Sequence, residues 1–290
     1  MFDISIIVPT IRPISVLRTL LDYISKIKGV RIEVILVNDD KSRQLKKSDF
    51  LYYDDELTVL NNSYGKGACS ARNCGLDLAR GTYCHFMDDD DEFLDVSVEL
   101  EDMAESDLIC FNALIAIDEM KYSTRHSYMG KSMIYGNTLG GLPRFLFRKK
   151  FLLDNGLRLP QNVRKYQDLA FLGQIQKFKP IIHFTPHLFM MANYSLNHDG
   201  ISSRSAFKIE AYYRSLLSFC DKSVLHADKR NVVKGFLEFQ AWYLVLSRPN
   251  LLVFLRLLMF DIQERQLLTA LRHLFIYVFP RLLIKIRSTL

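Results

Sequence analysis

The chain has 290 residues, of which 49% are hydrophobic and 24% are charged. This balance is that of a globular protein with a sizeable core, and it excludes a disordered chain, a collagen-like repeat and a small disulfide-stapled domain. The formal net charge is +6, and residues 251–290 contribute +4 of it through six basic and two acidic side chains. The positive surplus therefore belongs to the end of the chain.

The cysteines and the apolar segments indicate the compartment. Five cysteines form no C-x-x-C pair, and Cys84 and Cys110 stand in apolar runs, where a free thiol acts as a small hydrophobe. We therefore expect a reduced, cytoplasmic protein. The N-terminus has no basic segment followed by an apolar stretch, so no secretory signal is expected. No window reaches about 18 uncharged apolar residues, so no membrane span is expected either.

Strand and helix patterns alternate in the first part of the chain. Residues 4–8 and 32–37 are continuous apolar runs, typical of strands buried on both faces of a sheet. This alternation predicts an α/β fold with a mostly parallel sheet covered by helices. The helix expected between these two strands has an inward face made of Val16, Leu20, Leu21, Ile24 and Ile27. The elements predicted in chain order are strand 4–8, helix 14–28, strand 32–37, strand 57–60, helix 68–79 and strand 82–87.

The second part of the chain is less regular. Residues 107–117 predict a strand, and residues 121–130 predict a return strand beside it. A helix is expected over residues 165–177, followed by an apolar stretch over residues 181–194, with bends marked by Pro180 before the stretch and Pro186 within it. Beyond Ser205 the pattern is wholly helical. We expect one domain over residues 1–204, divided into halves 1–105 and 106–204, and a helical region over residues 205–290.

Polar residues follow three of the predicted parallel strands. Thr10 follows the first strand, Asp39 and Asp40 follow the second, and four consecutive aspartates occupy residues 88–91 after the fourth. Ligands of open parallel sheets bind beyond the carboxyl ends of the strands. We therefore expect these side chains, which are far apart in the sequence, to share one crevice.

The four consecutive aspartates predict a cation. Carboxylates so close together raise each other's pKa unless a positive charge lies among them. Oxygen ligands of this kind suit Mg²⁺ or Mn²⁺, which bind through one or two carboxylates together with substrate phosphates. The alternative is an acidic turn that caps a helix beginning near Phe93. A cap needs one aspartate rather than four, which favours the cation.

Four motifs follow one another over residues 4–91. They are Pro9-Thr10-Ile11-Arg12 after the first strand, Asp39-Asp40-Lys41-Ser42 after the second, Ala71-Arg72-Asn73-Cys74-Gly75 within the second helix, and Phe86-Met87-Asp88-Asp89-Asp90-Asp91 after the fourth strand. Together they are far more specific than any one alone, and in this order they resemble the family 2 inverting glycosyltransferases of bacterial polysaccharide and lipopolysaccharide synthesis. That family has a GT-A fold, a Rossmann-like and mostly parallel sheet flanked by helices, here with a C-terminal helical extension.

The resemblance implies a role for each matching residue. Asp40 would accept a hydrogen bond from the uracil N–H, with Asp39 as the adjacent candidate. Arg72 would reach the base or the diphosphate, for which its forked guanidinium is suited, although a helix-surface ion pair is the alternative. Asp90 would ligate Mn²⁺ or Mg²⁺. The positions implied to bind the nucleotide are Pro9, Thr10, Ile11, Asp39, Asp40, Arg72, Asp88 and Asp89.

Inverting transfer needs a carboxylate that takes the proton of the acceptor hydroxyl. The family supplies it from an E-D pair that opens a helix in the second half. The matching residues here are Gln167 and Asp168, so the resemblance implies that Asp168 is the catalytic base, with glutamine replacing the usual glutamate. The alternative is that Asp168 only caps its helix.

A closing loop of Y-R-x-H type matches less well. The arginine position is Ser195 and the histidine position is Asn197, so His198 is the shifted candidate for a metal ligand, against a plain surface histidine. Arg204 would supply the missing cation. His85, in an apolar run, is expected to be a core histidine, and Lys66 is expected to be solvated.

The end of the chain alternates apolar residues with arginines. Residues 250–287 predict basic amphipathic helices that would bind an anionic membrane surface, or alternatively pack on the catalytic domain or form a homo-oligomer. A peripheral position on the inner face of the cytoplasmic membrane would suit a lipid-linked saccharide acceptor. The basic residues are not interleaved with stacking aromatics in a recognisable module, so we expect no nucleic-acid partner.

These features predict a metal-dependent inverting glycosyltransferase that uses a UDP-sugar donor and a saccharide or lipid-linked saccharide acceptor in cell-surface glycan synthesis. One alternative is a sugar nucleotidyltransferase, although its glycine-rich first loop is absent after Val8. The other is a catalytically silent protein that binds a sugar nucleotide or assists assembly. The departures at Gln167, Ser195 and Asn197 keep that alternative open.

Overall fold

The structure is a computed structural model. It describes residues 2–50, 53, 56–94, 100, 104–117, 120–123, 141–163, 167–194 and 218. Its helices are α1 (Ile14–Ile24), α2 (Ala68–Leu78), α4 (Lys149–Asp154) and α5 (Gln167–Gln176), with short 3-10 turns η1 (Lys47–Phe50) and η3 (Leu142–Arg144). Its strands are β1 (Ile4–Thr10), β2 (Ile32–Asn38), β3 (Leu57–Asn61), β4 (Tyr83–Phe86), β5 (Glu92–Phe93), β6 (Leu108–Ile117), β7 (Met120–Ser123), β8 (Phe145–Arg148) and β9 (Ile182–Tyr194).

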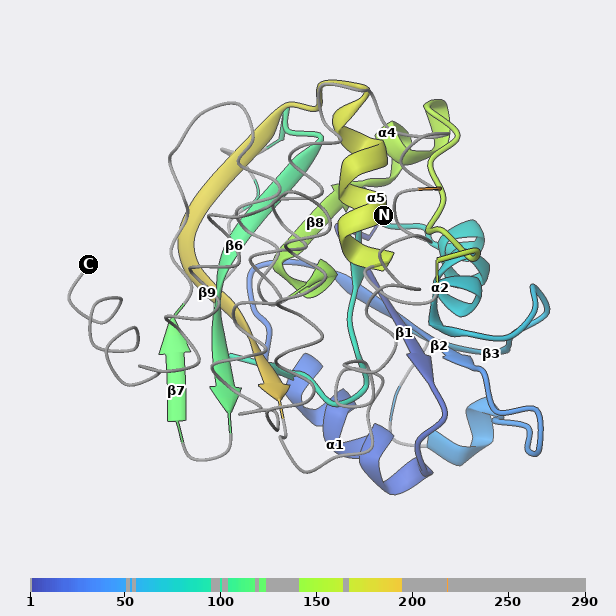
Figure 1. Ribbon diagram of the computed structural model, residues 1–290. Coiled ribbons are helices and arrows are strands. Elements are labelled where there is room, and N and C mark those ends of the chain that lie inside the picture. Colours follow the sequence, from blue (N-terminus) through green and yellow to red (C-terminus); the bar gives the residue numbers. More distant parts are fainter. Residues whose placement is uncertain are drawn as a thin grey trace, which may run out of the picture.

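The described strands form one mixed sheet (Figure 1). Its order is β3-β2-β1-β4-β8-β6-β9-β5, and β7 pairs with β6. The four strands from β3 to β4 are parallel, whereas β8 runs antiparallel to both β4 and β6. The predicted α/β fold with a mostly parallel first half is confirmed. The carboxyl ends of β1, β2, β3 and β4 therefore lie along one edge.

Strand β1 is buried along its whole length because helices cover both faces of the sheet. Side chains of a strand alternate between faces, so an uninterrupted apolar run fits only a strand covered on both. On one face Ile4, Ile6 and Val8 join the cluster that contains the inward residues of α1. On the other face Ile7 joins the cluster that contains α2, α4 and α5 residues such as Leu76.

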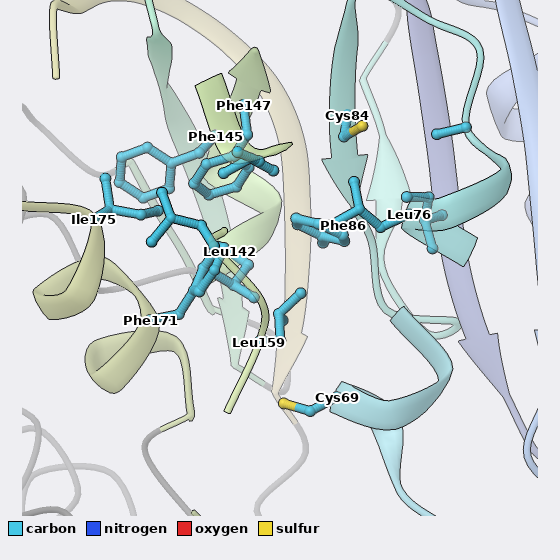
Figure 2. Close-up of a cluster of buried hydrophobic side chains, with 14 of the residues drawn as sticks. Cys69, Leu76, Cys84, Phe86, Leu142, Phe145, Phe147, Leu159, Phe171 and Ile175 are labelled. Atoms are coloured by element: carbon cyan, nitrogen blue, oxygen red, sulfur yellow. The ribbon is translucent and has the colours of Figure 1, made fainter. Parts of the chain in front are cut away.

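The second of these clusters joins the two halves of the described chain (Figure 2). Phe86 of β4 is fully buried, and its ring centroid lies 5.5 Å from that of Phe147 on β8 and 6.2 Å from that of Phe171 on α5. Leu142 of η3 and Leu76 of α2 belong to the same cluster. This shared core fixes α5 against the end of β4.

Helix α1 differs from its prediction in phase and length. Val16 is 37% exposed, whereas the neighbouring Leu17 is fully buried. The inward face is Leu17, Leu20, Leu21 and Ile24, which follows the i, i+3, i+4, i+7 spacing from Leu17. The prediction for Val16 was wrong because it began the apolar face one residue early. The helix also ends at Ile24, although Ile27 is buried as predicted.

The apolar stretch over residues 181–194 forms one strand, β9, which contains Pro186 and begins after Pro180. Its pairing with β6 is irregular between Cys110 and Asn112, whose partners are Phe184 and Leu188. Pro186 lies among the extra residues at this bulge. A proline lacks the N–H that a regular ladder uses, so strands accommodate it at bulges.

The aspartates at residues 88–91 do not cap a helix that begins near Phe93. Glu92 and Phe93 form strand β5, which pairs antiparallel with Met191 and Met190 of β9. The helix-cap alternative is therefore wrong for a helix that begins at Phe93, since a two-residue strand follows the acidic run in the described residues.

Several predictions lie outside the described residues. They are the return strand beyond Ser123, the boundary after residue 204 and the helices of residues 205–290. Among the helices that the structure does describe, none combines the length and apolar character needed to cross a membrane. Within the part of the chain that the structure describes, the cysteines at 69, 74, 84 and 110 are free and buried.

We expect Phe86→Ala to lower the free energy of unfolding by about 3–5 kcal/mol, because it empties a fully enclosed ring site. The matched variant Phe178→Ala, at a ring that is 37% exposed, should cost clearly less. Urea unfolding followed by circular dichroism measures both. Equal losses for the two variants would contradict the assignment of Phe86 to the core that joins the halves.

Candidate active site at the strand ends

Three strand ends meet at Thr10. Its buried hydroxyl donates a hydrogen bond to Asp89 Oδ2 at 2.7 Å, and the backbone N–H of Asp39 donates to its carbonyl oxygen at 2.8 Å. Thr10 ends β1, Asp39 follows β2 and Asp89 follows β4. The predicted convergence of these polar strand ends is therefore confirmed, whereas their contacts with a nucleotide stay predictions.

Two arginines tie these strand ends together. Arg12 Nε lies 3.6 Å from Asp89 Oδ1, and Arg12 Nη2 lies 3.3 Å from Asp90 Oδ2. Arg43 donates a hydrogen bond to the carbonyl of Arg12, and its Nε lies 3.5 Å from Asp40 Oδ2. Sequence reasoning assigned no role to either arginine. The available signal was their position directly after the acidic or polar strand ends.

Asp39 fixes the loop between β3 and α2. Its Oδ1 accepts from the Asn62 side chain at 2.7 Å, and its Oδ2 accepts from the backbone N–H of Gly67 at 2.7 Å. Gly67 has a φ of 116°, a conformation that favours glycine. Both oxygens of Asp39 therefore hold the entry to the helix that carries Arg72.

Asp40 is held as an anion at the same edge. Its Oδ1 accepts from the hydroxyl of Ser42 at 2.6 Å and from the backbone N–H of Ser42 at 2.9 Å. These hydrogen bonds, together with the charge of Arg43, lower the pKa of Asp40. An ionised carboxylate that accepts hydrogen bonds is the state that would accept from a base N–H.

Negative charge is in excess along the acidic run. Burial raises the pKa of Asp89, although Thr10 and Arg12 act against this. Burial and the neighbouring charges of Asp88 and Asp89 raise the pKa of Asp90 to about 6. The side chain of Asp90 is nevertheless 52% exposed, so a cation from solvent can reach it. These observations bear out the expectation that adjacent carboxylates disfavour one another's charge.

The donor set fits a divalent ion held jointly with phosphates. Within the described residues no three His, Cys, Asp or Glu side chains come together as a complete metal cage. Mg²⁺ and Mn²⁺ at phosphate sites need only one or two carboxylates, with water and phosphate oxygens as the other ligands. The exposed carboxylate of Asp90, with its raised pKa, fits that requirement. His198 and Arg204 lie outside the described residues.

Arg72 lies between carboxylates from both halves of the described chain. It is 5% exposed on α2, and its guanidinium forms an ion pair with Asp88. Burial acts against its charge, but Asp88 and Asp168 raise the pKa of Arg72 and keep it protonated. Its Nε has no hydrogen-bond partner among the described residues. The alternative of a helix-surface pair is wrong because the side chain is buried.

Asp168, in the first turn of α5, interacts electrostatically with this arginine. Burial raises the pKa of Asp168 to about 6, with Arg72 acting against the rise and Asp88 adding to it. The backbone N–H of Leu142 donates a hydrogen bond to its carboxylate. Asp168 therefore shares the charge environment of the strand-end carboxylate Asp88, and its role as a catalytic base stays a prediction.

The neighbouring Gln167 has a structural use that a glutamate would lack. Its Nε2 donates a hydrogen bond to the carbonyl of Val163 at 2.7 Å, and an ionised carboxylate has no proton to donate. The glutamine that replaces the expected glutamate thus ties the start of α5 to Val163, and Asp168 keeps its place in the motif.

Two of the remaining predictions are confirmed. His85 is fully buried, its Nδ1 lies 3.2 Å from the carbonyl oxygen of Phe145, and burial lowers its pKa to about 4. It is therefore a neutral core histidine packed against Phe93 and Phe189. Lys66 is exposed.

A comparison with known protein families gives a match over a range that contains these residues. The family described as "Glycosyl transferase family 2" matches residues 5–198, which is more than half of the chain. The chain belongs to glycosyl transferase family 2. The matched range includes every strand-end residue described above as well as Asp168.

Relatives in this family are glycosyltransferases. An uncharacterized glycosyltransferase of Haemophilus influenzae is 28% identical over 196 residues, which is 63% of this chain and 64% of that protein. The glucosyltransferase WfgD of Escherichia coli, named for UDP-Glc and α-D-GlcNAc-diphosphoundecaprenol, is 28% identical over 98 residues, or 34% of this chain and 39% of that protein. The matches thus span less than two thirds of either relative.

Solved structures agree with the fold. TarS 1-349 of S. aureus in complex with UDP-GlcNAc has a TM-score of 0.59 at 19% identity, covering 96% of this chain and 81% of that one. The mannosyltransferase PcManGT of Pyrobaculum calidifontis, in complex with GDP-Man and Mn²⁺, has a TM-score of 0.53 at 13% identity, covering 97% and 90%. At these identities the likeness shows the GT-A fold.

The raised pKa of Asp168 predicts a pH-dependent stability. The folded protein holds the Asp168 proton up to about pH 6, whereas an unfolded aspartate releases it near pH 4. This carboxylate therefore destabilises the fold increasingly as pH rises through that window. The difference in free energy of unfolding, Asp168→Asn minus wild type, should therefore increase by about 1–3 kcal/mol from pH 4 to pH 7.5.

Urea unfolding at several pH values measures this difference. The control is Asp154→Asn, at a side chain that is 56% exposed and paired with Lys150. Exposed pairs contribute little, so its difference from wild type should stay within about 1 kcal/mol over the range. If the difference in free energy of unfolding between Asp168→Asn and wild type stays constant or falls as pH rises, the carboxylate is not destabilised by burial.

Proposed function

We propose that this chain transfers a sugar from a UDP-sugar to a saccharide or lipid-linked saccharide acceptor, with inversion at the anomeric carbon and with a divalent ion. The observation that carries the proposal is the buried Arg72, which pairs with Asp88 at the strand ends and shares the charge environment of Asp168. A donor-binding edge and a carboxylate with a pKa of about 6 thereby meet in one site.

The strand-end edge is the proposed donor site. Asp40 would accept from the uracil N–H, and Thr10 and the 65% exposed Ile11 would line the base pocket beside Pro9. Asp39 would contribute by holding the loop before α2, and Arg72 would reach the diphosphate. The names of WfgD and of the TarS complex, which mention UDP-Glc and UDP-GlcNAc, support a uridine donor.

The acidic run is the proposed metal site. Asp90 would be the direct ligand, Asp88 and Asp89 would contact the ribose or the metal-bound waters, and His198 would be a further ligand. A bound Mn²⁺ or Mg²⁺ would neutralise charge on the departing diphosphate. Before a metal ion binds, Arg12 balances part of the negative charge of Asp89 and Asp90.

Asp168 is the proposed general base. It takes the proton of the acceptor hydroxyl while that oxygen bonds to the anomeric carbon, and the bond from that carbon to the phosphate oxygen breaks on the opposite face. UDP leaves with the electron pair, so an α-linked donor gives a β-linked product. A base with a pKa of about 6 is ionised at neutral pH and still accepts a proton readily.

The proposals for the acceptor and for the cellular location are based on the charge at the end of the chain. Residues 251–290 carry most of the net positive charge, which would attract an anionic membrane surface. WfgD is named for a diphosphoundecaprenol-linked sugar, which supports a lipid-linked acceptor. We propose a catalytic domain over residues 1–204 and a helical region over residues 205–290 that binds the inner face of the cytoplasmic membrane or forms a homo-oligomer.

Asp168→Asn should lower the rate of transfer and leave donor binding intact. The loss in rate should be about 10²–10⁴-fold, the range that general-base catalysis supplies. UDP release from UDP-glucose and UDP-N-acetylglucosamine with Mn²⁺ measures the rate, and calorimetric titration with UDP measures binding. The exposed control Asp154→Asn should keep both.

The wild-type pH profile belongs to the same test. Its rate should rise through about pH 6 and level off above it, because the base must be ionised. A fully active Asp168→Asn would remove the base assignment. UDP binding by the wild type with no release from either donor would instead favour the catalytically silent protein.

Asp90→Asn should uncouple UDP binding from the metal. We expect the affinity for UDP in the presence of Mn²⁺ to fall at least about tenfold, since even outer-shell partners of a metal contribute that much. Calorimetric titration of UDP with and without Mn²⁺ measures the effect, again with Asp154→Asn as control. An unchanged Mn²⁺ dependence would exclude Asp90 as the ligand.

A further inference from the structure

The turn formed by Gly141 and η3 touches the carboxylate of Asp168. Gly141 has a φ of 65°, and a Cβ built on it would lie 2.6 Å from Asp168 Oδ2. The next residue, Leu142, donates its backbone N–H to the same carboxylate. The backbone of residues 141–142 therefore lies directly against the atoms that would accept the acceptor's proton.

This turn is anchored at two residues that follow Gly141. The side chain of Leu142 is fully buried in the cluster that contains Phe171 and Ile175 of α5 (Figure 2). The side chain of Arg144 is also buried, and its Nε donates to the carbonyl of Phe111 on β6 at 3.0 Å. The turn is thus fixed to α5 and to the sheet, so its backbone is a rigid surface for the carboxylate.

We propose that Gly141 is a positioning residue for Asp168, an inference that rests on the proposed function of Asp168 as the general base. The missing side chain leaves room for Oδ2, and the Leu142 N–H orients the carboxylate toward Arg72 and the strand ends. A methyl group at residue 141 would meet the free end of the aspartate side chain rather than backbone, so the carboxylate is the part that moves.

The chain offers a matched control for the backbone strain. Gly156 has a φ of 61°, close to that of Gly141, but a Cβ built on it would meet nothing within 4 Å. An alanine at either site pays the same penalty for the left-handed conformation. Only Gly141→Ala adds a contact with Asp168.

The test compares Gly141→Ala with Gly156→Ala. Both variants should lose a similar few degrees in melting temperature and should bind UDP with Mn²⁺ as wild type does. For UDP release from UDP-glucose, kcat of Gly141→Ala should fall about 10- to 100-fold, as expected for a misplaced catalytic group, and Gly156→Ala should keep wild-type kcat. Equal kcat values in the two variants would overturn the proposal.

A double variant separates positioning from general damage. In an Asp168→Asn background Gly141→Ala should cause no further loss of rate, because the group that it displaces no longer acts as a base. A full additional loss would overturn the proposal. An active Asp168→Asn would instead remove the proposed function, so the two failures are distinguishable.

A second pair covers the case in which Gly141→Ala does not fold. Leu142→Ala and Leu157→Ala each remove a fully buried leucine side chain from the same cluster. Leu142→Ala loosens the turn that orients Asp168, so its kcat should fall at least tenfold below that of Leu157→Ala while UDP binding is kept. Equal kcat values in this pair would also count against the positioning role.

Discussion

The buried charge of Arg72 is the interaction on which the site depends. A guanidinium that is 5% exposed on α2 needs nearby counter-charges, and here they are Asp88 after β4 and Asp168 on α5. Removing Arg72 would leave the Asp168 carboxylate without its neighbouring cation, and an uncompensated buried charge is strongly destabilising. The sheet that brings α2 to β4, and the core that brings α5 to the same place, are therefore coupled to the site through one side chain.

The same edge carries more negative charge than its own arginines neutralise. Arg12 and Arg43 each pair with strand-end aspartates, yet the pKa of Asp90 is still raised to about 6. Under the proposed function, a divalent ion would offset this excess when a nucleotide diphosphate binds beside Arg72. Family membership and these local charges are independent observations that support the proposal.

Sequence reasoning reached the strand ends but not the contacts across them. Continuous apolar runs predicted β1 and β2, and the rule for parallel sheets predicted the meeting of Thr10 with Asp89. It missed the arginine pairs and the Gly141 turn, because periodicity does not give side-chain direction and because residues 141 and 168 are brought together only by the tertiary core. The phase error at Val16 has the same origin, since a pattern of apolar residues fixes the helix but not which side chain leads its buried face.

The most direct measurement is a crystal structure with UDP and MnCl₂, in which the anomalous signal of manganese marks the ion. We expect one manganese peak at the carboxylate of Asp90, with the diphosphate bound to it and the uracil beside Asp40 and Thr10. Asp168 should face the open side of the diphosphate. A manganese ion bound elsewhere, or a nucleotide away from the ends of β1, β2 and β4, would contradict the proposed site.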